Sequence, residues 1–470
     1  MPDSLIPQLM TRLQGRVITP VDRDYQIARL VYNNLVDKRP AATVRVSGVD
    51  DVVGAVRIAQ EFGVDLAIRG GGHSASGFGT CDGGIVIDFA DYDRVRVNPV
   101  TARARAEGGA RWAGFNHATH AFGMATTGGL DGAEGIAGPT LSGGIGYLAR
   151  KYGLSCDNLL SAEVVIADGT VHTASAIENE DLFWAPRGGG GNFGVVTSFE
   201  YRLHPVDMVH AGVIFYSIDD SRTVAEFYRE HLASAPKEFS AFLGFHLCPA
   251  ASYLPSERHG EPMCVVAGIW IGDPAGGGRH AGSPTWMSPR SSAPWCSGCP
   301  NAEANTVFGG GLRSGLHVYG KANFLPELSD GAITAYLDFG RMVPTLDTSV
   351  HIHPIDGAVQ RVGPEETAFP YRHTRFSPTI ACMWDDPADS QANMKWVRDF
   401  WTALRPFSEP DRYIHFKDSE DQVRIADTFR VNYDRLATVK AKYDPENVFH
   451  LNENIKPVVP RFSTFHDSTT

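Results

Sequence analysis

The sequence IRGGGHSASG, residues 68–77, is the stretch of this 470-residue chain that most strongly indicates its fold. Three consecutive glycines, Gly70 to Gly72, strip side chains from one loop, and His73 follows them directly. A run of glycines indicates that a ligand or another backbone segment comes very close to the loop. The preceding residues, VDLAIR, are typical of a short strand. We therefore expect a strand that leads into a ligand-binding loop with a histidine beside the ligand.

Two further glycine-rich tracts follow, at residues 126–153 (TTGGLDGAEGIAGPTLSGGIGYLARKYG) and 188–194 (GGGGNFG). Residues 189–194 satisfy the dinucleotide-binding pattern G-x-G-x-x-G, but the strand-like VVTSFEYRL follows where that pattern requires a helix. A Rossmann site is therefore excluded. Two alternatives remain: backbone N–H groups of several glycine loops hold a pyrophosphate together, or the glycines only make tight connections. Three such tracts in one half of the chain favour the first alternative.

The hydrophobic periodicity of the chain predicts a mixture of helices and strands. We expect helices at 50–63, 111–123 and 432–443, strands at 64–69, 83–89, 94–98, 102–109 and 195–203, and a hairpin over 161–175 that turns at Asp168-Gly169. The glycine tracts stop near residue 205. We expect a first domain over 1–205, a middle domain over 206–425, and a segment over 426–470 that returns to the first domain.

The formal net charge of −12 argues against a nucleic-acid-binding surface. The sequence has no apolar run long enough to cross a membrane, and its N-terminus lacks the apolar centre of a signal peptide, so we expect a cytoplasmic protein that binds no membrane. Seven scattered cysteines fit reduced thiols better than disulfides. The lone pair Cys296-x-x-Cys299 is weak evidence for zinc, and we expect no metal.

Four segments, in order, resemble the FAD-linked oxidases of the berberine-bridge-enzyme-like family, within the vanillyl-alcohol-oxidase superfamily. They are RGGGHS (69–74), GPTLSGGIGYLARKYGLSCDN (138–158), DLFWAPRGGGGNFGVV (181–196) and YDPENVFHLNENI (443–455). The pattern is most similar to the 6-hydroxy-D-nicotine-oxidase-like members. The resemblance implies an α+β fold: a two-lobed PCMH-type FAD-binding domain, and a substrate domain whose antiparallel sheet is covered by helices.

The resemblance also implies how FAD is held. His73 stands where the family bonds a histidine covalently to the flavin 8α carbon, and a neutral imidazole nitrogen suits that attack. Many relatives add a second bond through a cysteine, but Asp131 occupies that position here, so we expect a single covalent link. Cys156 lies beyond the position and is expected to be a small buried residue. The residues expected to bind the cofactor are Arg69, Gly70, Gly71, Gly72, His73, Ser74, Gly77, Thr127, Gly128, Gly129, Gly135, Gly138, Thr140, Gly143, Gly144, Gly146, Tyr147, Asp157, Asn158, Gly194, Val195, Val196, Asn452 and Asn454.

The family reaction moves a hydride from a C–H bond beside a hydroxyl or amine to flavin N5, and O2 reoxidises the flavin with release of hydrogen peroxide. Many relatives place a tyrosine base at the position that Phe416 holds here, in Tyr413-Ile414-His415-Phe416. Three explanations stay open: an amine substrate that needs no base, a different pose, or another base. The candidate catalytic residues are Tyr413, His415 and the pair His351 and His353.

The expected partners are a small organic substrate and O2, with the chain a monomer or homodimer. A flavin-dependent dehydrogenase with another acceptor, or a nonredox binding protein that keeps the FAD fold, are the alternatives. Residues 276–311, rich in Ser, Pro and Gly, show neither helical nor strand periodicity. We interpret them as a local reading-frame disruption, with a lineage-specific loop as the alternative.

Overall fold

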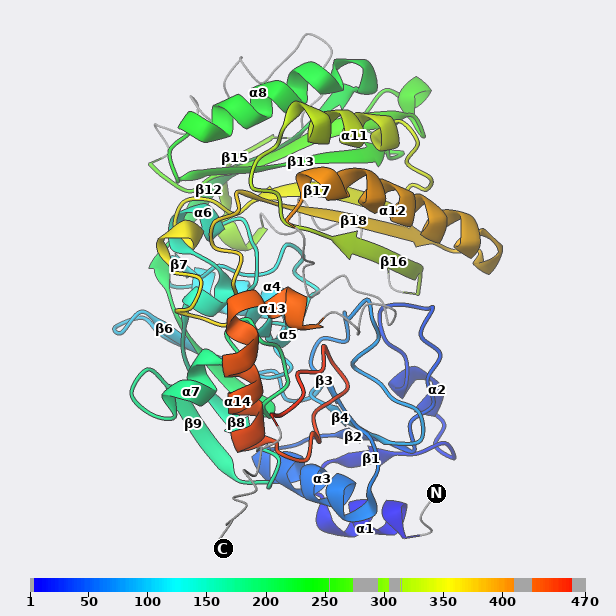
Figure 1. The fold of residues 1–470 in the computed structure, drawn as a ribbon, viewed down its shortest axis with the longest axis vertical. Helices are drawn as coiled ribbons and strands as arrows, with labels where there is room; N and C mark the ends of the chain where they lie inside the picture. Colours follow the sequence, from blue (N-terminus) through cyan, green and yellow to red (C-terminus); the bar gives the residue numbers. More distant parts are fainter. Residues whose placement is uncertain are drawn as a thin grey trace, which may run out of the picture.

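The computed structural model describes residues 4–252, 254–273, 295–303, 313, 315–409 and 425–458. Its described strands form sheets of four, five, two and seven strands. The seven-stranded sheet and its helices lie at one end of the molecule, and the other sheets lie below it (Figure 1). This mixture of helices and largely antiparallel sheets confirms the predicted α+β class.

The four-stranded sheet carries the first glycine loop. Its order is β1 (Arg16–Ile18), β2 (Ala42–Arg45), β4 (Ile85–Asp88), β3 (Leu66–Arg69), and β2, β4 and β3 run parallel. Helix α3 (Val49–Phe62) connects β2 to β3 and buries Val52 and Val56 in one core with Leu66 and Ile85; α1 (Leu5–Arg12) joins the same core. The predicted helix at 50–63 and the strands on either side of the first glycine loop are therefore confirmed.

The five-stranded antiparallel sheet has the order β5 (Val95–Asn98), β6 (Arg103–Glu107), β10 (Val195–Arg202), β8 (Leu159–Val165), β9 (Val171–Ser175). The predicted hairpin turns where expected: Gly169 has φ +76° and the Thr170 N–H donates to Asp168 Oδ1 at 2.7 Å. The third glycine tract runs into β10, as the strand-like sequence predicted. Shorter elements here are α2 (Tyr25–Ala28), α4 (Trp112–His120), β7 (Met124–Ala125), α5 (Ala137–Leu141), α6 (Ala149–Tyr152), α7 (Glu180–Trp184) and β11 (His204–Pro205).

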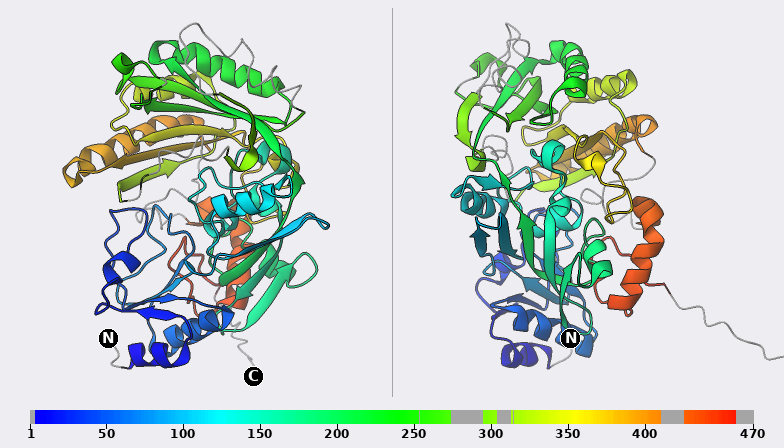
Figure 2. Two further views of the ribbon diagram at one scale, coloured as in Figure 1. Left: turned by 180° about the vertical axis from the view of Figure 1, so that it is seen from behind. Right: turned by 90° about the vertical axis from the view of Figure 1, so that its left-hand side faces the viewer.

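The C-terminal helix α14 (Tyr433–Tyr443) lies beside α7, although the two helices are far apart in the sequence (Figures 1 and 2). Its Leu436 and Val439 share a core with Leu182 and Phe199. The side chain of Lys442 also forms an ion pair with Asp181 at 2.6 Å. Helix α13 (Ile425–Phe429) precedes it. The last described part of the chain thus packs on the first half of the sequence.

The seven-stranded sheet is antiparallel throughout, in the order β15 (Trp295–Pro300), β12 (Met208–Ser217), β14 (Pro262–Trp270), β13 (Phe239–Leu247), β17 (Ser349–Pro354), β18 (Phe376–Trp384), β16 (His317–Ala322). Helices α8 (Ser221–Ser234), α11 (Asp330–Gly340) and α12 (Ser390–Leu404) cover one face, which buries residues such as Leu243, Val350 and Ile352. Because successive side chains alternate across a strand, their neighbours point to the opposite face, toward the glycine tracts.

Strand β15 corrects one expectation. It lies within 276–311, where the sequence showed no strand period, yet Cys299 pairs with Val209 of β12 at the sheet edge. Backbone pairing with a neighbouring strand sets this element, which periodicity alone does not report. Most of the interval, and so most of the reading-frame hypothesis, lies outside the described residues and stays a prediction.

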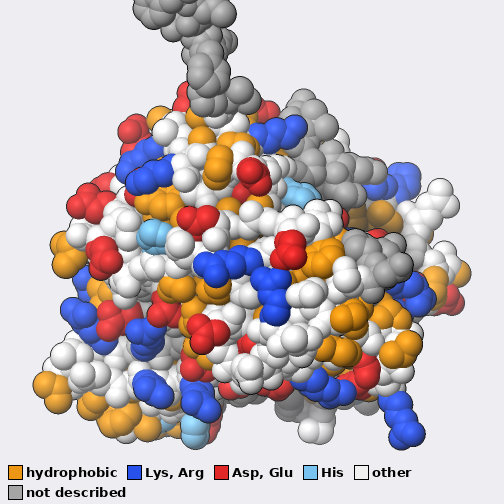
Figure 3. Space-filling view, turned by 90° about the horizontal axis from the view of Figure 1, so that it is seen from below, with side chains coloured by type: hydrophobic (Ala, Val, Ile, Leu, Met, Phe, Trp, Pro, Cys, Tyr) orange, Lys and Arg blue, Asp and Glu red, His pale blue; other side chains and the backbone are white. Residues whose placement is uncertain are grey.

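The surface and the thiols agree with the composition. Positive and negative side chains are interspersed on the face that Figure 3 shows. Within the described ranges, no helix has the length and apolar character that a bilayer crossing requires. The six cysteines whose side chains the structure describes are buried and free.

Candidate cofactor and substrate site

A cavity of about 860 Å³ lies between the glycine tracts and the uncovered face of the seven-stranded sheet. All three glycine tracts contribute to its wall, and residues 451–453 close it from the C-terminal side. The cavity is therefore lined by the backbone of glycine-rich loops on one side and by the side chains of a sheet on the other.

The first glycine loop meets the second backbone to backbone. A Cβ on Gly71 would lie 2.4 Å from the Gly135 nitrogen, and Gly72 has φ +73°, so neither position accepts a side chain without displacement. Arg69 fixes the start of the loop, because its guanidinium donates to Asp88 at 2.9 Å and to the Ala28 carbonyl at 2.6 Å.

His73 lies on the cavity wall at the end of this loop. Its ring stacks on Tyr32 with 4.7 Å between ring centroids and 11° between planes. Burial, helped by the positive charge of Arg111, lowers the pKa of His73 to about 4. The imidazole is therefore neutral at physiological pH and keeps a nitrogen lone pair.

Asn192 ties the third glycine tract to the C-terminal segment. Its side-chain amide donates to the carbonyls of Gly189 and Glu453 at 2.9 and 3.0 Å, and its Oδ1 accepts from the Ile455 N–H at 3.0 Å. Lys440, with a fully buried side chain, donates to the Asn192 carbonyl at 2.7 Å. Sequence reasoning missed both residues, because their partners lie some 250 positions away.

Two carboxyl groups face the cavity beside these loops. Asp131, at the position where the family resemblance predicted the second tether of other members, and Glu134, three residues further along, both line the cavity. Burial, together with the charge of Asp131, raises the pKa of Glu134 to about 7. Burial also raises the pKa of Asp131.

The sheet side of the cavity carries three histidines, His246, His351 and His353. Burial lowers the pKa of His246 to about 4 and that of His353 to about 3, and the pKa of His351 lies well below its ordinary value because of burial and the two neighbouring imidazoles. All three rings are therefore neutral at physiological pH. Of these, the sequence singled out His351 and His353 but not His246.

The cofactor-binding residues predicted from the sequence divide into two groups. Those that line the cavity are Arg69, Gly70, Gly71, Gly72, His73, Ser74, Gly129, Gly135, Gly138, Gly144, Tyr147, Gly194, Val196 and Asn452. Those that do not line it are Gly77, Thr127, Gly128, Thr140, Gly143, Gly146, Asp157, Asn158, Val195 and Asn454. For the second group, direct contact with a cofactor stays a prediction. Tyr413, His415 and Phe416 lie outside the described residues.

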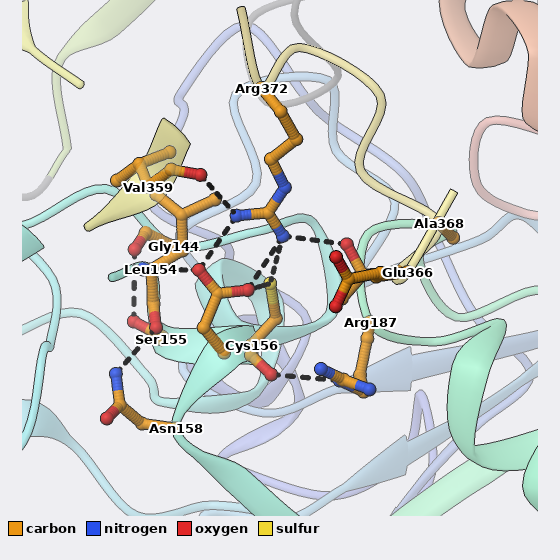
Figure 4. Close-up of polar contacts among 12 residues, drawn as sticks. Gly144, Leu154, Ser155, Cys156, Asn158, Arg187, Val359, Glu366, Ala368 and Arg372 are labelled. Carbon is orange, nitrogen blue, oxygen red and sulfur yellow. Dashed lines mark hydrogen bonds and ion pairs between the residues drawn. The ribbon is translucent and has the colours of Figure 1, made fainter. Parts of the chain in front are cut away.

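Arg372 binds one residue of the second group, Asp157 (Figure 4). Its guanidinium donates to the two carboxylate oxygens of Asp157 at 2.7 and 2.8 Å and to Thr367 at 2.7 Å. Cys156 lies under the same guanidinium, and burial raises the pKa of its thiol to about 12. Cys156 does not line the cavity, and a protonated thiol is a poor nucleophile. Asp157 and Cys156 thus hold the second glycine tract in place.

The cavity fits a flavin nucleotide on two observations. The glycines on its wall leave space that a Cβ would fill. The buried Oδ1 of Asn454, next to the lining residue Glu453, has no hydrogen-bond partner within the described part of the chain, which suits a ligand with polar atoms. The backbone N–H groups of the glycine tracts would hold the pyrophosphate, and His73 would face the ring.

Comparisons with known proteins agree with this arrangement. Residues 40–175 match the FAD binding domain family, and residues 412–456 match the berberine and berberine-like family. The chain is 30% identical to the FAD-linked oxidoreductase YgaK of Bacillus subtilis, over 95% of this chain and 98% of that protein. It is 38% identical to (R)-6-hydroxynicotine oxidase of Paenarthrobacter nicotinovorans, over 95% and 97% of the two chains.

A solved structure shows the same fold. Glucooligosaccharide oxidase of Acremonium strictum superposes with a TM-score of 0.84 at 22% identity, over 97% of this chain and all of that chain, and its FAD is described as 6-S-cysteinyl, 8α-N1-histidyl. The predicted PCMH-type FAD-binding fold is thereby confirmed. With glycine tracts, C-terminal segment and full-length relatives in agreement, the chain belongs to the berberine-bridge-enzyme-like family of FAD-linked oxidoreductases.

Proposed function

We propose that this oxidoreductase is an oxidase: it takes a hydride from a C–H bond beside a hydroxyl or amine of a small organic substrate and passes it to flavin N5, with O2 as final acceptor and H2O2 as product. One observation carries the proposal. A single cavity connects the glycine tracts to the uncovered sheet face, so a cofactor on the first surface meets a substrate on the second. FAD supplies the hydride acceptor when bound.

His73 would hold FAD by a single covalent link. A neutral imidazole on the cavity wall supports this, since the attacking nitrogen needs a free lone pair. Asp131 replaces the second tethering thiol, and Cys156 lies away from the cavity with its thiol protonated. The ring of Tyr32 holds the His73 ring in one orientation.

His353 would accept the proton of a substrate hydroxyl. It lines the cavity, and its Nε2 has no hydrogen-bond partner among described residues, which leaves this nitrogen able to accept from the substrate. Tyr413 and His415 remain candidates for the same role. If the substrate is an amine, its own lone pair drives hydride loss and no base is required.

Intact-mass measurement of the denatured, purified protein tests the covalent link. The wild type should carry the added mass of one FAD, and His73→Ala should carry none while still binding flavin that acid precipitation releases. Aerobic peroxide detection across alcohols and amines then tests the oxidase. If a substrate bleaches the flavin absorbance and O2 does not restore it, the protein is a dehydrogenase. A purified protein without flavin would refute the proposal.

A further inference from the structure

The three cavity histidines form one connected group on two neighbouring strands. His246 comes from β13, and His351 and His353 come from β17, which pairs with β13. The Nε2 atoms of His246 and His351 lie 2.8 Å apart, so one imidazole donates to the other. Phe242 packs against His351 and His353 with ring centroids 4.5 and 5.2 Å away. We refer to His246, His351 and His353 as the histidine wall.

Gly244 makes this contact possible. It pairs directly with His351 in the sheet, and a Cβ at this position would lie 2.9 Å from His351 Cδ2 and 3.1 Å from His246 Nε2. Any larger residue would push the two imidazoles apart. The glycine is in a strand interior, where it weakens the sheet unless the missing side chain serves a purpose.

His353 offers the free polar atom of the wall. Its side chain is 5% exposed and lines the cavity, and its Nε2 has no hydrogen-bond partner among the described residues. A buried polar atom without a partner costs stability, so its presence points to a ligand that satisfies it.

The other residues on the sheet side of the cavity are mostly apolar. Side chains from five strands surround the histidines: Val213, Phe215, Phe242, Val265, Val318 and Met383. A sugar would leave most of its hydroxyl groups without partners against such a surface, and each unpaired group weakens binding. A flat, largely apolar ring buries its surface here without that loss.

Apart from the backbone N–H groups of the glycine tracts, which would hold the pyrophosphate, the charged side chains on the cavity lining disfavour an anionic substrate. The described lining carries four acidic residues: Asp131, Glu134, Asp347 and Glu453. Arg69 is the one Lys or Arg on that lining, and its guanidinium is bound to Asp88. A carboxylate or phosphate substrate would therefore meet like charge with no free cation to offset it.

We propose that the histidine wall, with Gly244 behind it, selects as substrate an uncharged and largely apolar ring compound with one hydroxyl or amine N–H group, which hydrogen-bonds to His353. The proposal rests on the proposed oxidase function and narrows its substrate class. It assigns His246 and His351 a positioning role: their mutual hydrogen bond fixes the rings beside His353.

Matched ligand pairs test the wall directly. We would titrate the purified holoenzyme by calorimetry with benzyl alcohol, 1-indanol and 2-naphthalenemethanol, with their hydrocarbon counterparts toluene, indane and 2-methylnaphthalene, and with cellobiose. In the wild type, at least one ring alcohol should bind about tenfold more tightly than its hydrocarbon, the value of one hydrogen bond to a buried group. Cellobiose should bind more weakly than that alcohol.

Variants separate the wall from general stability. His353→Phe should abolish the preference for the alcohol while the hydrocarbon still binds, and His353→Gln should restore part of it. Gly244→Ala should reduce the preference without loss of bound FAD. His317→Phe is the matched control, because His317 lies on the helix-covered face of the same sheet, stacked on Trp384, and it should change nothing.

Two results would overturn the substrate class: tighter binding of cellobiose than of every ring alcohol, or an alcohol preference that His353→Phe leaves intact. Both results are possible in a protein that binds FAD and forms peroxide, so neither contradicts the proposed oxidase function. A purified protein that lacks FAD contradicts the oxidase itself, and calorimetry still reports on the wall.

Discussion

Replacement of Arg372 by leucine should cost the protein about 3–5 kcal/mol of unfolding free energy, since it removes one partner of a buried ion pair. The pair is well buried: the side chains of Arg372 and Asp157 are 2% and 7% exposed. Asp157 Oδ2 also accepts the Leu154 N–H at 2.9 Å, so the carboxylate cannot turn toward water without breaking a second bond. The leucine variant leaves this charge without its cation.

Urea unfolding of the holoenzyme, followed by circular dichroism, measures the loss. The double variant Asp157→Asn, Arg372→Leu is the control, since it removes the uncompensated charge and should lose clearly less than Arg372→Leu alone. A loss below about 1 kcal/mol in the single variant would refute the reasoning. So would equal losses in the two variants, because packing and not charge would then explain the effect.

Three further outcomes are expected. Cys156→Ser should leave the covalent flavin mass unchanged, because the thiol is buried and protonated away from the cavity; a lost adduct would make it a tether. Gly71→Val should lower the flavin-to-protein absorbance ratio and cost about 2–3 kcal/mol, since its side chain meets Gly135; an unchanged ratio would contradict the close approach. The pKa of Glu134 is about 7 in the folded protein and 4.5 in the unfolded protein, so between these pH values the folded state keeps a proton that the unfolded state has lost. The free energy of unfolding therefore falls as the pH rises from 4.5 to about 7. Glu134→Gln should therefore raise the melting temperature at pH 8 and leave it nearly unchanged at pH 4, and equal shifts at both pH values would exclude titration as the cause.

Sequence patterns predicted the structure correctly where it depends only on residues that are neighbours in the sequence. The loop at Gly70 to Gly72, the strand after Gly194 and the turn at Asp168-Gly169 each follow from the conformations that glycine permits and from the period of the neighbouring residues. The domain boundaries at 205 and 425 stay predictions. The FAD-binding family also followed from four short motifs.

The sequence could not show contacts between distant positions. His246 and His351 are 105 positions apart, and only the register of β13 with β17 brings them together. Asp157 was expected at the cofactor, but Arg372, 215 positions away, takes both of its oxygens. Strand β15 was missed because its partner strand, and not its own periodicity, defines it.

The bond from Lys440 to Asn192 has a consequence for how the protein is made. The floor of the cavity is complete only when residues 440–455 pack on a glycine tract that was synthesised some 250 residues earlier. During translation the glycine tracts emerge from the ribosome long before this floor exists. A chain truncated before Lys440 would therefore lack the residues that close the cavity from the C-terminal side.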